Sequence, residues 1–402
     1  MPHGPLRPPD LIIQDELHLI SGPLGSLVGL YETAVDELSS WEVGGKRIRP
    51  KVIASTATVR RAAEQVQKLF CRSLEIFPPH GTDIADNFFS LQREPGEEHP
   101  GRLYLGVCAP GRRLPEASLR VYVALLAAGQ KLYEQYDSAA DPWMTLVGYF
   151  NSIRELGGMR RVVDDDVRTR LRDTDKRGLA RRMILGLDEL TSRRTGTEIP
   201  GILDRLDVIF NQADELQRRT QRRNQQRSDS PTPFDVVLAT NMISVGVDVD
   251  RLGLMVVAGQ PKTTAEYIQA TSRVGRKHPG LVVTLYNWAR PRDLSHYATF
   301  EHYHSTFYQH VEALSVTPFA ARALDRGLSA VLVSLVRLAA AELNANPKAA
   351  AVTRDQPALA DAIERIVRRA GLVETDNSRA DEVRDMLAER RDLWLKSIAQ
   401  AQ

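Results

Sequence analysis

Short apolar runs separated by amphipathic stretches extend along the first 290 or so residues of the chain. The runs that predict strands lie at residues 10–14, 51–58, 102–109, 145–150, 234–240, 254–258 and 281–286. Near-continuous apolar runs of this length are typical of strands buried on both faces of a parallel sheet. Two stretches, residues 59–69 and 116–136, have the amphipathic period of helices. The alternation of strands with helices predicts an α/β fold.

Polar and charged stretches divide the chain into three expected parts. We expect residues 1–110 to form a first, partial α/β domain with its connection, and residues 111–290 to form a second domain. Residues from about 160 to 230 are dense in Arg and Asp, and they predict an insertion that ends in a flexible basic arm. Strand patterns vanish beyond Arg290, so residues 291–402 are expected to be helical.

Overall composition leaves the choice of partner open. The 53 Lys and Arg residues nearly balance 51 Asp and Glu, and a net charge of +2 neither requires nor excludes nucleic-acid binding. The two cysteines, Cys71 and Cys108, have no pairing motif around them, which argues against a disulfide scaffold and a zinc ribbon. The N-terminus does not have the pattern of a signal peptide, and the longest apolar runs are too short and polar for a membrane span. We therefore expect a soluble, cytoplasmic protein.

Two carboxylates, Asp15 and Glu16, follow the first predicted strand. Open α/β sheets bind ligands at the carboxyl ends of their parallel strands. At such a place Asp15 is suited to hold Mg²⁺ through water, and Glu16 to orient and deprotonate an attacking water. The alternative is an acidic strand end that faces solvent.

A second candidate site lies in the predicted helix at residues 266–276. Gln269, Arg273 and Arg276 are four and three residues apart and would share one helical face. Two guanidinium groups on one face are suited to capture a phosphate, and an arginine finger neutralises the charge that develops on a transferred γ-phosphate. A solvated surface face is the alternative.

The segment that follows the strand at residues 234–240 is a third candidate. Gly246 would permit close approach of the backbone, and Asp248 could accept a hydrogen bond from a ligand hydroxyl. An ordinary turn containing Asn and Gly is the alternative.

Basic and histidine-rich stretches suggest weaker hypotheses. The arm at residues 218–227, which includes Arg222 and Arg223, could follow a phosphate backbone, although a solvated insertion is favoured. The histidines at residues 296–310 match no familiar zinc spacing, and a helical face packed against the second domain is the favoured interpretation.

Five of these segments, in this order, resemble the motifs of superfamily 2 DExH-type helicases. Residues 15–18 (Asp-Glu-Leu-His) resemble motif II, 56–58 (Thr-Ala-Thr) motif III, 149–152 (Tyr-Phe-Asn-Ser) motif IV, 240–248 motif V and 269–276 motif VI. The resemblance covers residues 10 to about 290. Within the superfamily, the phrases at residues 8–25 and 148–157 look like the helicase subunits of DISARM anti-phage systems.

The resemblance implies a RecA-like P-loop NTPase architecture, with a truncated first domain, a complete second domain and a helical C-terminal region. It implies ATP and Mg²⁺ as cofactors and a nucleic acid as partner, with DNA favoured over RNA. By this resemblance, Asp15 would hold the metal and Glu16 would activate the attacking water, while His18, Thr56 and Thr58 would couple the state of ATP to domain movement. Gly246 and Asp248 would contact the nucleotide, and Gln269, Arg273 and Arg276 would face its γ-phosphate across the interdomain cleft. The residues implied to contact nucleic acid are Asn151, Thr240, Arg222 and Arg223.

One departure from the helicase pattern limits the expected activity. These helicases carry a Gly-x-x-x-x-Gly-Lys-Ser/Thr loop before motif II, whose amides and lysine hold the phosphates. Only nine residues precede Asp10, and Gly44-Gly45-Lys46-Arg47 follows motif II, lacks the Ser/Thr and predicts a turn. We therefore expect the C-terminal part of an ATP-dependent helicase or translocase, inactive alone. The alternatives are a non-catalytic nucleic-acid-binding or regulatory subunit completed by a partner chain, and a gene fragment or mis-called start codon.

Overall fold

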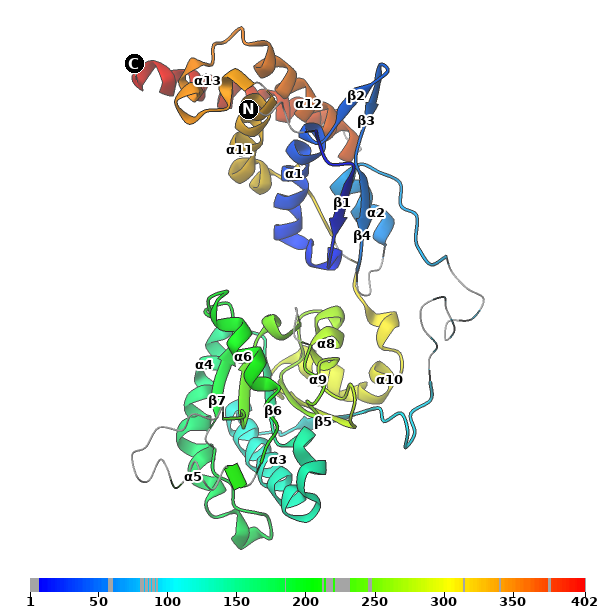
Figure 1. Ribbon diagram of the computed structural model, residues 1–402, viewed down its shortest axis with the longest axis vertical. Helices are drawn as coiled ribbons and strands as arrows, with labels where there is room; N and C mark the ends of the chain where they lie inside the picture. Colours follow the sequence, from blue (N-terminus) through cyan, green and yellow to red (C-terminus); the bar gives the residue numbers. More distant parts are fainter. Residues whose placement is uncertain are drawn as a thin grey trace. The chain divides into compact units, whose positions relative to one another are not determined.

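The chain divides into two compact units (Figure 1). Unit 1 comprises Met1–Pro79 and Glu312–Gln402, and unit 2 comprises His80–Val311. The computed structural model describes residues 7–56, 61–79, 83, 86, 88, 91, 93–184, 186–211, 213, 214, 220, 232–244, 248–313, 315–339, 341–374 and 377–401.

Unit 1 contains a small parallel sheet covered by helices on one face. Strand β1 (Leu11–Gln14) pairs in parallel with β4 (Lys51–Ala54), in a register that places Ile13 beside Ile53. The connection between them contains α1 (Gly22–Leu38) and a hairpin of β2 (Trp41–Val43) and β3 (Lys46–Ile48), and α2 (Ala62–Phe70) follows β4. Gly44 and Gly45 turn the hairpin with φ of 58° and 73°, values that suit glycine. The predicted turn is confirmed.

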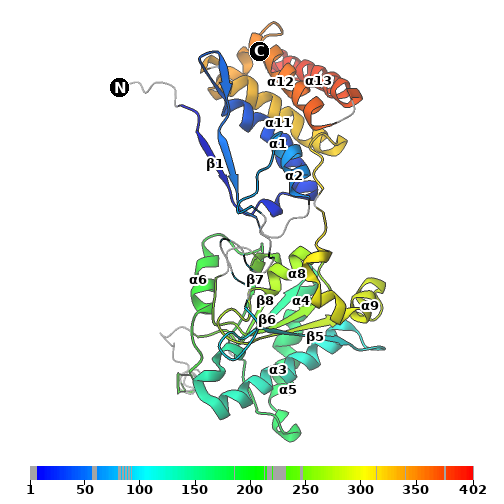
Figure 2. The same cartoon turned by 90° about the vertical axis from the view of Figure 1, so that its right-hand side faces the viewer.

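The C-terminal helices pack in the same unit as the first strands (Figure 2). Helices α11 (Ala321–Ala339), α12 (Pro357–Val373) and α13 (Asn377–Ala401) share one apolar core with α1. Leu30 of α1, Leu328 of α11 and Ile366 of α12 are each at most 1% exposed in it. The C-terminal helices are therefore an integral part of unit 1.

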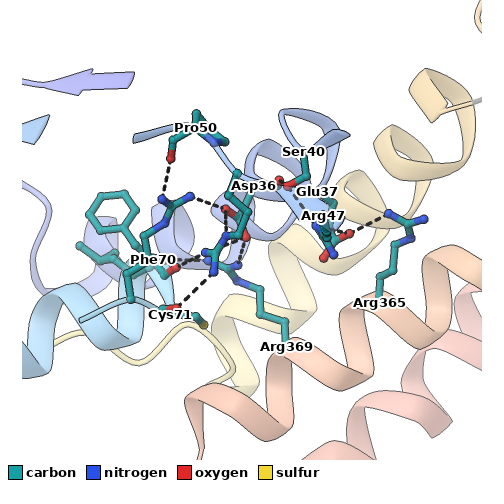
Figure 3. A network of polar contacts seen from close by, with 12 residues as sticks. Asp36, Glu37, Ser40, Arg47, Pro50, Phe70, Cys71, Arg365 and Arg369 are labelled. Atoms are coloured by element: carbon teal, nitrogen blue, oxygen red, sulfur yellow. Dashed lines mark hydrogen bonds and ion pairs between the residues drawn. The ribbon is translucent and has the colours of Figure 1, made fainter. Parts of the chain in front are cut away.

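Two adjacent carboxylates of α1 form ion pairs with α12, with the hairpin and with the segments that follow the hairpin and α2 (Figure 3). Asp36 accepts hydrogen bonds from Arg49 and Arg72 at 3.0 Å and from Arg369 of α12 at 3.2 Å. Glu37 pairs with Arg47 of the hairpin at 2.7 Å and with Arg365 and Arg368 of α12 at 2.8 and 3.2 Å. Burial alone would raise the pKa of Asp36 and of Glu37, but the neighbouring arginines outweigh it and lower both. These ion pairs join the hairpin and α12 to α1.

Unit 2 is built on a six-stranded parallel sheet of order β5-β10-β9-β6-β8-β7. The strands are β5 (Arg102–Cys108), β6 (Leu146–Phe150), β7 (Leu187–Leu190), β8 (Val236–Ala239), β9 (Leu254–Ala258) and β10 (Gly280–Tyr286). Their apolar residues are buried on both faces in β6, β8 and β9, which confirms the expected α/β class.

Helices cover both faces of this sheet. On one face α3 (Leu114–Tyr136), α4 (Ile153–Val162) and the short α5 (Arg168–Leu171) form a core with β6 and β9. The other face is covered by α6 (Glu198–Leu206), α8 (Thr264–Thr271), α9 (Pro291–Ala298) and α10 (Phe300–Ser305). Side chains of α6, α8 and α10 form a second core there with the strands. Within this unit, His304 of α10 contacts the rings of Tyr104 and Tyr267, with centroids 4.9 and 5.8 Å away.

The observed units differ from the expected domain limits in three places. Strand β5 pairs with β10 and therefore belongs to unit 2, not to a domain at residues 1–110. Strand β7 pairs with β8 inside the segment expected to be an insertion, so that part of the segment belongs to the sheet. Residues 291–311, which include α9 and α10, lie in unit 2, whereas the rest of the expected C-terminal region lies in unit 1.

The expectation that the first strand is buried on both faces is wrong. Leu11 and Ile13 point to one side of β1 and are 45% and 72% exposed, and Ile53 beside them is 51% exposed. The opposite side is covered, because Val52 packs against the small core formed by Leu17 and residues of α2. Among the described residues, no helix is long and apolar enough to span a membrane.

Candidate functional site

The acids Asp15 and Glu16 lie where β1 ends beside β4. The Ser55 hydroxyl and the Glu16 backbone N–H both donate to the Asp15 carboxylate, the latter at 2.9 Å. These hydrogen bonds, that of Ser55 first, lower the pKa of Asp15, which is exposed. Glu16 has φ 53° and ψ 46°, a left-handed conformation that costs a residue with a side chain about 1–2 kcal/mol. The chain therefore turns at Glu16, and the Ser55 and Glu16 donors hold an ionised carboxylate at the strand end.

Buried polar contacts stabilise this turn. Leu17 N–H donates to the carbonyl of Ser55 at 3.0 Å, which continues the pairing of β1 with β4 past the strands. The side chain of Gln65 in α2, only 1% exposed, donates to the carbonyls of Leu17 and Ile20 at 3.3 and 2.8 Å. His18 is buried, with Nδ1 3.3 Å from the Glu16 carboxylate. Thr56 is exposed at the end of β4, and Thr58 lies outside the described residues.

In unit 2, the predicted face of Gln269, Arg273 and Arg276 is only partly helical. Helix α8 ends at Thr271, so Gln269 lies in its last turn, while Arg273 and Arg276 follow in a loop. The expectation that all three share one helical face is therefore wrong. Thr263 caps the N-terminus of this helix, and its hydroxyl accepts from the backbone N–H of Glu266 at 3.2 Å.

The loop after α8 has a tightly specified shape. Gly275 has φ 72°, and a Cβ there would lie 2.8 Å from Arg102 Cγ and from Gly280 Cα, so that a larger residue is excluded. The Arg102 guanidinium of β5 donates to the carbonyls of Val274 and Ser272 at 2.6 and 3.4 Å. This loop presents Arg276 to Asp248, with which it forms an ion pair, and Lys277 pairs with Asp250 at 2.5 Å. The structure thus brings Asp248 and Arg276 together within unit 2.

Two further predicted residues lie at the carboxyl ends of strands of unit 2. Asn151 follows β6, and its amide donates to the carbonyls of Ala258 and Gly259, both at 3.3 Å. Its Oδ1 is buried without a hydrogen-bond partner among the described residues. Thr240 follows β8, is 5% exposed and donates to Asn241 Oδ1 at 3.3 Å. Arg222, Arg223 and Gly246 lie outside the residues that the structure describes.

The donors present fit a water-bound magnesium ion at Asp15. Among the described residues, no group of three or more His, Cys, Asp or Glu side chains gathers where it could enclose a metal. Mg²⁺ keeps several waters and commonly binds one or two carboxylates plus phosphate oxygens. An exposed, ionised Asp15 next to the Ser55 hydroxyl meets that requirement.

Sequence patterns missed Gln65 and Arg102, which shape the two loops. Gln65 lies on the buried side of α2 among apolar residues, and a buried amide needs hydrogen-bond partners, a signal that was present in the helical pattern. Arg102 opens a strand that was expected in the other domain, and its contact with residues 272–274 depends on the pairing of β5 with β10.

The family comparison agrees with these motifs. Residues 203–278 match the family described as the helicase conserved C-terminal domain. The matched span runs from α6 through β8 and β9 to the loop of Arg276, and so includes the predicted motifs V and VI. The chain therefore contains a superfamily 2 helicase C-terminal domain, and the resemblance seen in the sequence is confirmed.

A curated relative narrows this class. The chain is 48% identical over 347 residues to the DISARM protein DrmA of Bacillus paralicheniformis. The match covers 85% of this chain but 29% of that relative, so the chain spans less than a third of the relative's length.

Solved structures of nucleic-acid helicases are similar at low identity. The DUF1998 helicase MrfA bound to DNA is 16% identical, with a TM-score of 0.48 over 82% of this chain and 37% of that one. The Mycobacterium smegmatis helicase Lhr, bound to single-stranded DNA and AMP-PNP, is 14% identical, with a TM-score of 0.48 over 93% of this chain and 38% of that one.

Proposed function

We propose that this chain is the C-terminal part of an ATP-dependent superfamily 2 helicase or translocase that acts on DNA in phage defence, in the cytoplasm. The helicase C-terminal domain and the 48% identity to DISARM protein DrmA support this proposal. The single structural observation that carries it is a contact between the segments that resemble motifs II and III. Ser55, next to motif III, donates to the Asp15 carboxylate of motif II where β1 and β4 end.

The side chains divide the chemistry of ATP hydrolysis between them. When bound, Mg²⁺ would neutralise charge on the phosphates. Asp15 would hold the ion through water, and Glu16 would orient the attacking water and accept its proton. Thr56 and Thr58, with His18, would transmit the nucleotide state to the motion of the domains.

The motifs of unit 2 supply the positive charge and the nucleic-acid contacts. Arg273 and Arg276, with Gln269, would stabilise the γ-phosphate, which requires Arg276 to exchange its Asp248 partner for phosphate oxygens. Asp248 and Gly246 would then contact the nucleotide, and Asn151, Thr240 and the arm with Arg222 and Arg223 would contact DNA.

Substitution of one proposed catalytic residue in each unit tests the proposal. In an enzyme supplied with a phosphate-binding loop, on the same polypeptide or by a partner chain, Glu16→Gln and Arg276→Ala should each lower DNA-stimulated ATP hydrolysis by roughly 10³-fold. DNA affinity should stay within a few-fold, since neither residue is assigned to DNA. Turnover is measured by phosphate release and affinity by fluorescence anisotropy.

Lys277→Ala is the matched control for Arg276→Ala. Lys277 is the neighbouring cation, its side chain is 68% exposed and it pairs with Asp250, so its loss should change turnover only a few-fold. Turnover of both catalytic variants close to that of wild type would remove these residues from the active site.

One observation favours a second function, a subunit completed by a partner chain. Among the described residues β1 pairs only with β4, and Leu11, Ile13 and Ile53 leave one side of this pair exposed. The edges of such a strand pair can accept further strands through main-chain hydrogen bonds, and its exposed apolar side can pack against another polypeptide. Ile13→Asp with Ile53→Asp should then abolish co-elution with a subunit that carries the phosphate-binding loop. Unchanged co-elution would exclude this face as the contact.

A further inference from the structure

Strand β5 contacts the end of α8 and the loop after it through the side chains of one strand face. Alternate residues of a strand point to the same side, so Arg102 and Tyr104 share one face of β5. The Tyr104 hydroxyl lies 3.2 Å from the hydroxyl of Thr271, the last residue of α8. The Arg102 guanidinium bonds the backbone of the residues that follow. The loop that contains Arg273 and Arg276 is therefore joined to β5.

Arg102 donates to the carbonyls of the residues before and after Arg273. Its Nε donates to the Val274 carbonyl at 2.6 Å, and its Nη2 donates to the Ser272 carbonyl at 3.4 Å. A guanidinium is planar, always charged and rich in donors, and its hydrogen bonds are charge-assisted. Two such bonds fix the orientation of the backbone from which the Arg273 side chain leaves the loop.

The aliphatic stem of Arg102 packs against two glycines of the same loop. A Cβ on Gly275 would lie 2.8 Å from Arg102 Cγ, and one on Gly280 would lie 3.1 Å from it. From the other side, Gly275 N–H donates at 2.8 Å to the carbonyl of Leu252, just before β9. The loop is thus held between β5 and the segment before β9, and Arg276 follows the glycine at which both contacts meet.

A second arginine, beyond the opposite end of β5, has only local contacts. The side chain of Arg112 pairs with Glu116, four residues further on, at 2.9 Å, and both side chains are exposed. Pairs of this kind contribute little to stability. Arg102 instead bonds residues that lie 170 and 172 positions away in sequence. Its contact depends on the pairing of β5 with β10, and Arg112 therefore provides a matched control.

We infer that Arg102 is a positioning residue for ATP hydrolysis, which holds the loop after α8 so that Arg273 and Arg276 reach the γ-phosphate. This inference rests on the proposed function and adds to it a residue outside the predicted motifs. Charge stabilisation in phosphoryl transfer depends on placement, and a displacement of about 1 Å can lower the rate by roughly 10²-fold. Arg102 acts through the backbone of the loop and not on the phosphate itself.

The first test measures the loop in the full chain, without nucleotide. Arg102→Met keeps an aliphatic stem against Gly275 but removes the donors, so peptides covering residues 272–277 should exchange their amide hydrogens at least roughly tenfold faster. Arg112→Met should leave these peptides unchanged, and peptides of β9 should be unchanged in both variants. Loop exchange in Arg102→Met equal to that of wild type would overturn the inference.

The second test measures turnover in the enzyme supplied with a phosphate-binding loop. Arg102→Met should lower kcat by roughly 10²-fold while KM for ATP changes less than about threefold. Arg102→Lys restores one donor and should bring turnover to within roughly tenfold of wild type. Arg112→Met should stay within about twofold of wild type. Turnover of Arg102→Met equal to that of this control would overturn the inference and leave the proposed function standing.

A double-mutant cycle separates positioning from a general loss of stability. In a variant that already lacks Arg273 and Arg276, Arg102→Met should lower single-turnover phosphate release less than about threefold, since the loop no longer carries the charges that it places. A merely structural role would give the same fractional loss in both backgrounds, and that outcome would overturn the inference. Turnover that does not depend on Arg273 and Arg276 would contradict the proposed function, and the inference with it.

Discussion

Three arginines from three segments of unit 1 donate hydrogen bonds to the Asp36 carboxylate. Its side chain is 10% exposed and that of Arg369 is 5% exposed. Asp36→Asn keeps the shape but leaves buried guanidinium charge uncompensated, so we expect a loss of about 3 kcal/mol in the stability of unit 1. Urea unfolding followed by hydrogen exchange of α1 and α12 peptides measures it. Asp392→Asn, at an exposed ion pair, serves as control and should cost under about 0.5 kcal/mol.

The same pairs should make unit 1 sensitive to acid. The pKa of Asp36 is lower in the folded chain than its ordinary value of 3.8, and that of Glu37 is lower than 4.5. A lowered folded pKa gives stability that is complete above the unfolded value and is lost as pH falls through the folded one. Wild-type unit 1 should therefore lose stability as pH drops below about 4.5, with a steeper slope than Asp36→Asn. Equal slopes for the two proteins would show that Asp36 is not responsible.

At the scale of single elements, two glycines of unit 2 should respond oppositely to alanine. Gly158→Ala, in the interior of α4 with open space around it, should stabilise unit 2 by about 0.5–1 kcal/mol. Gly275→Ala, at φ 72° and with a Cβ 2.8 Å from Arg102 and Gly280, should destabilise it by about 1–3 kcal/mol. Thermal unfolding of both variants decides this. A destabilised Gly158→Ala protein would indicate a packing role for that glycine.

Elements with a strong apolar signal could be predicted from the sequence, and those with a mixed signal could not. Strand β9 has the predicted bounds, and β6, β8 and β10 begin or end within two residues of theirs. Strand β7 contains Asp188 and Glu189, so its composition resembles the polar segment around it, and only pairing with β8 reveals it. Helix α8 was expected to continue to Arg276, but Gly275 N–H bonds to the carbonyl of Leu252, and this tertiary contact belongs to the loop after the helix.

The candidate site shows the same division. Spacing placed Asp15, Thr56, Asn151 and Thr240 at strand ends, where the structure has them. The pairing of Arg276 with Asp248 and the support of the Asp15 turn by Gln65 join residues 28 and 45 or more positions apart in sequence. Neither follows from a local pattern, because each depends on which elements pack together.

At the scale of the whole molecule, the two sheets should differ in resistance to opening. The strand pair β1–β4 leaves Ile13 72% exposed and Ile53 51% exposed, whereas all four residues of β8 are fully buried between two neighbouring strands. Amide hydrogens exchange through local opening, which costs less where few apolar contacts are broken. We therefore expect peptides covering Leu11–Gln14 to exchange at least tenfold faster than those covering Val236–Ala239. Hydrogen-exchange mass spectrometry of the isolated chain measures both, with β9 as an internal reference for a buried strand. Equal protection of β1 and β8 would mean that the apolar side of β1 is covered in solution, and adding a subunit that carries further strands should then leave the exchange of β1 unchanged.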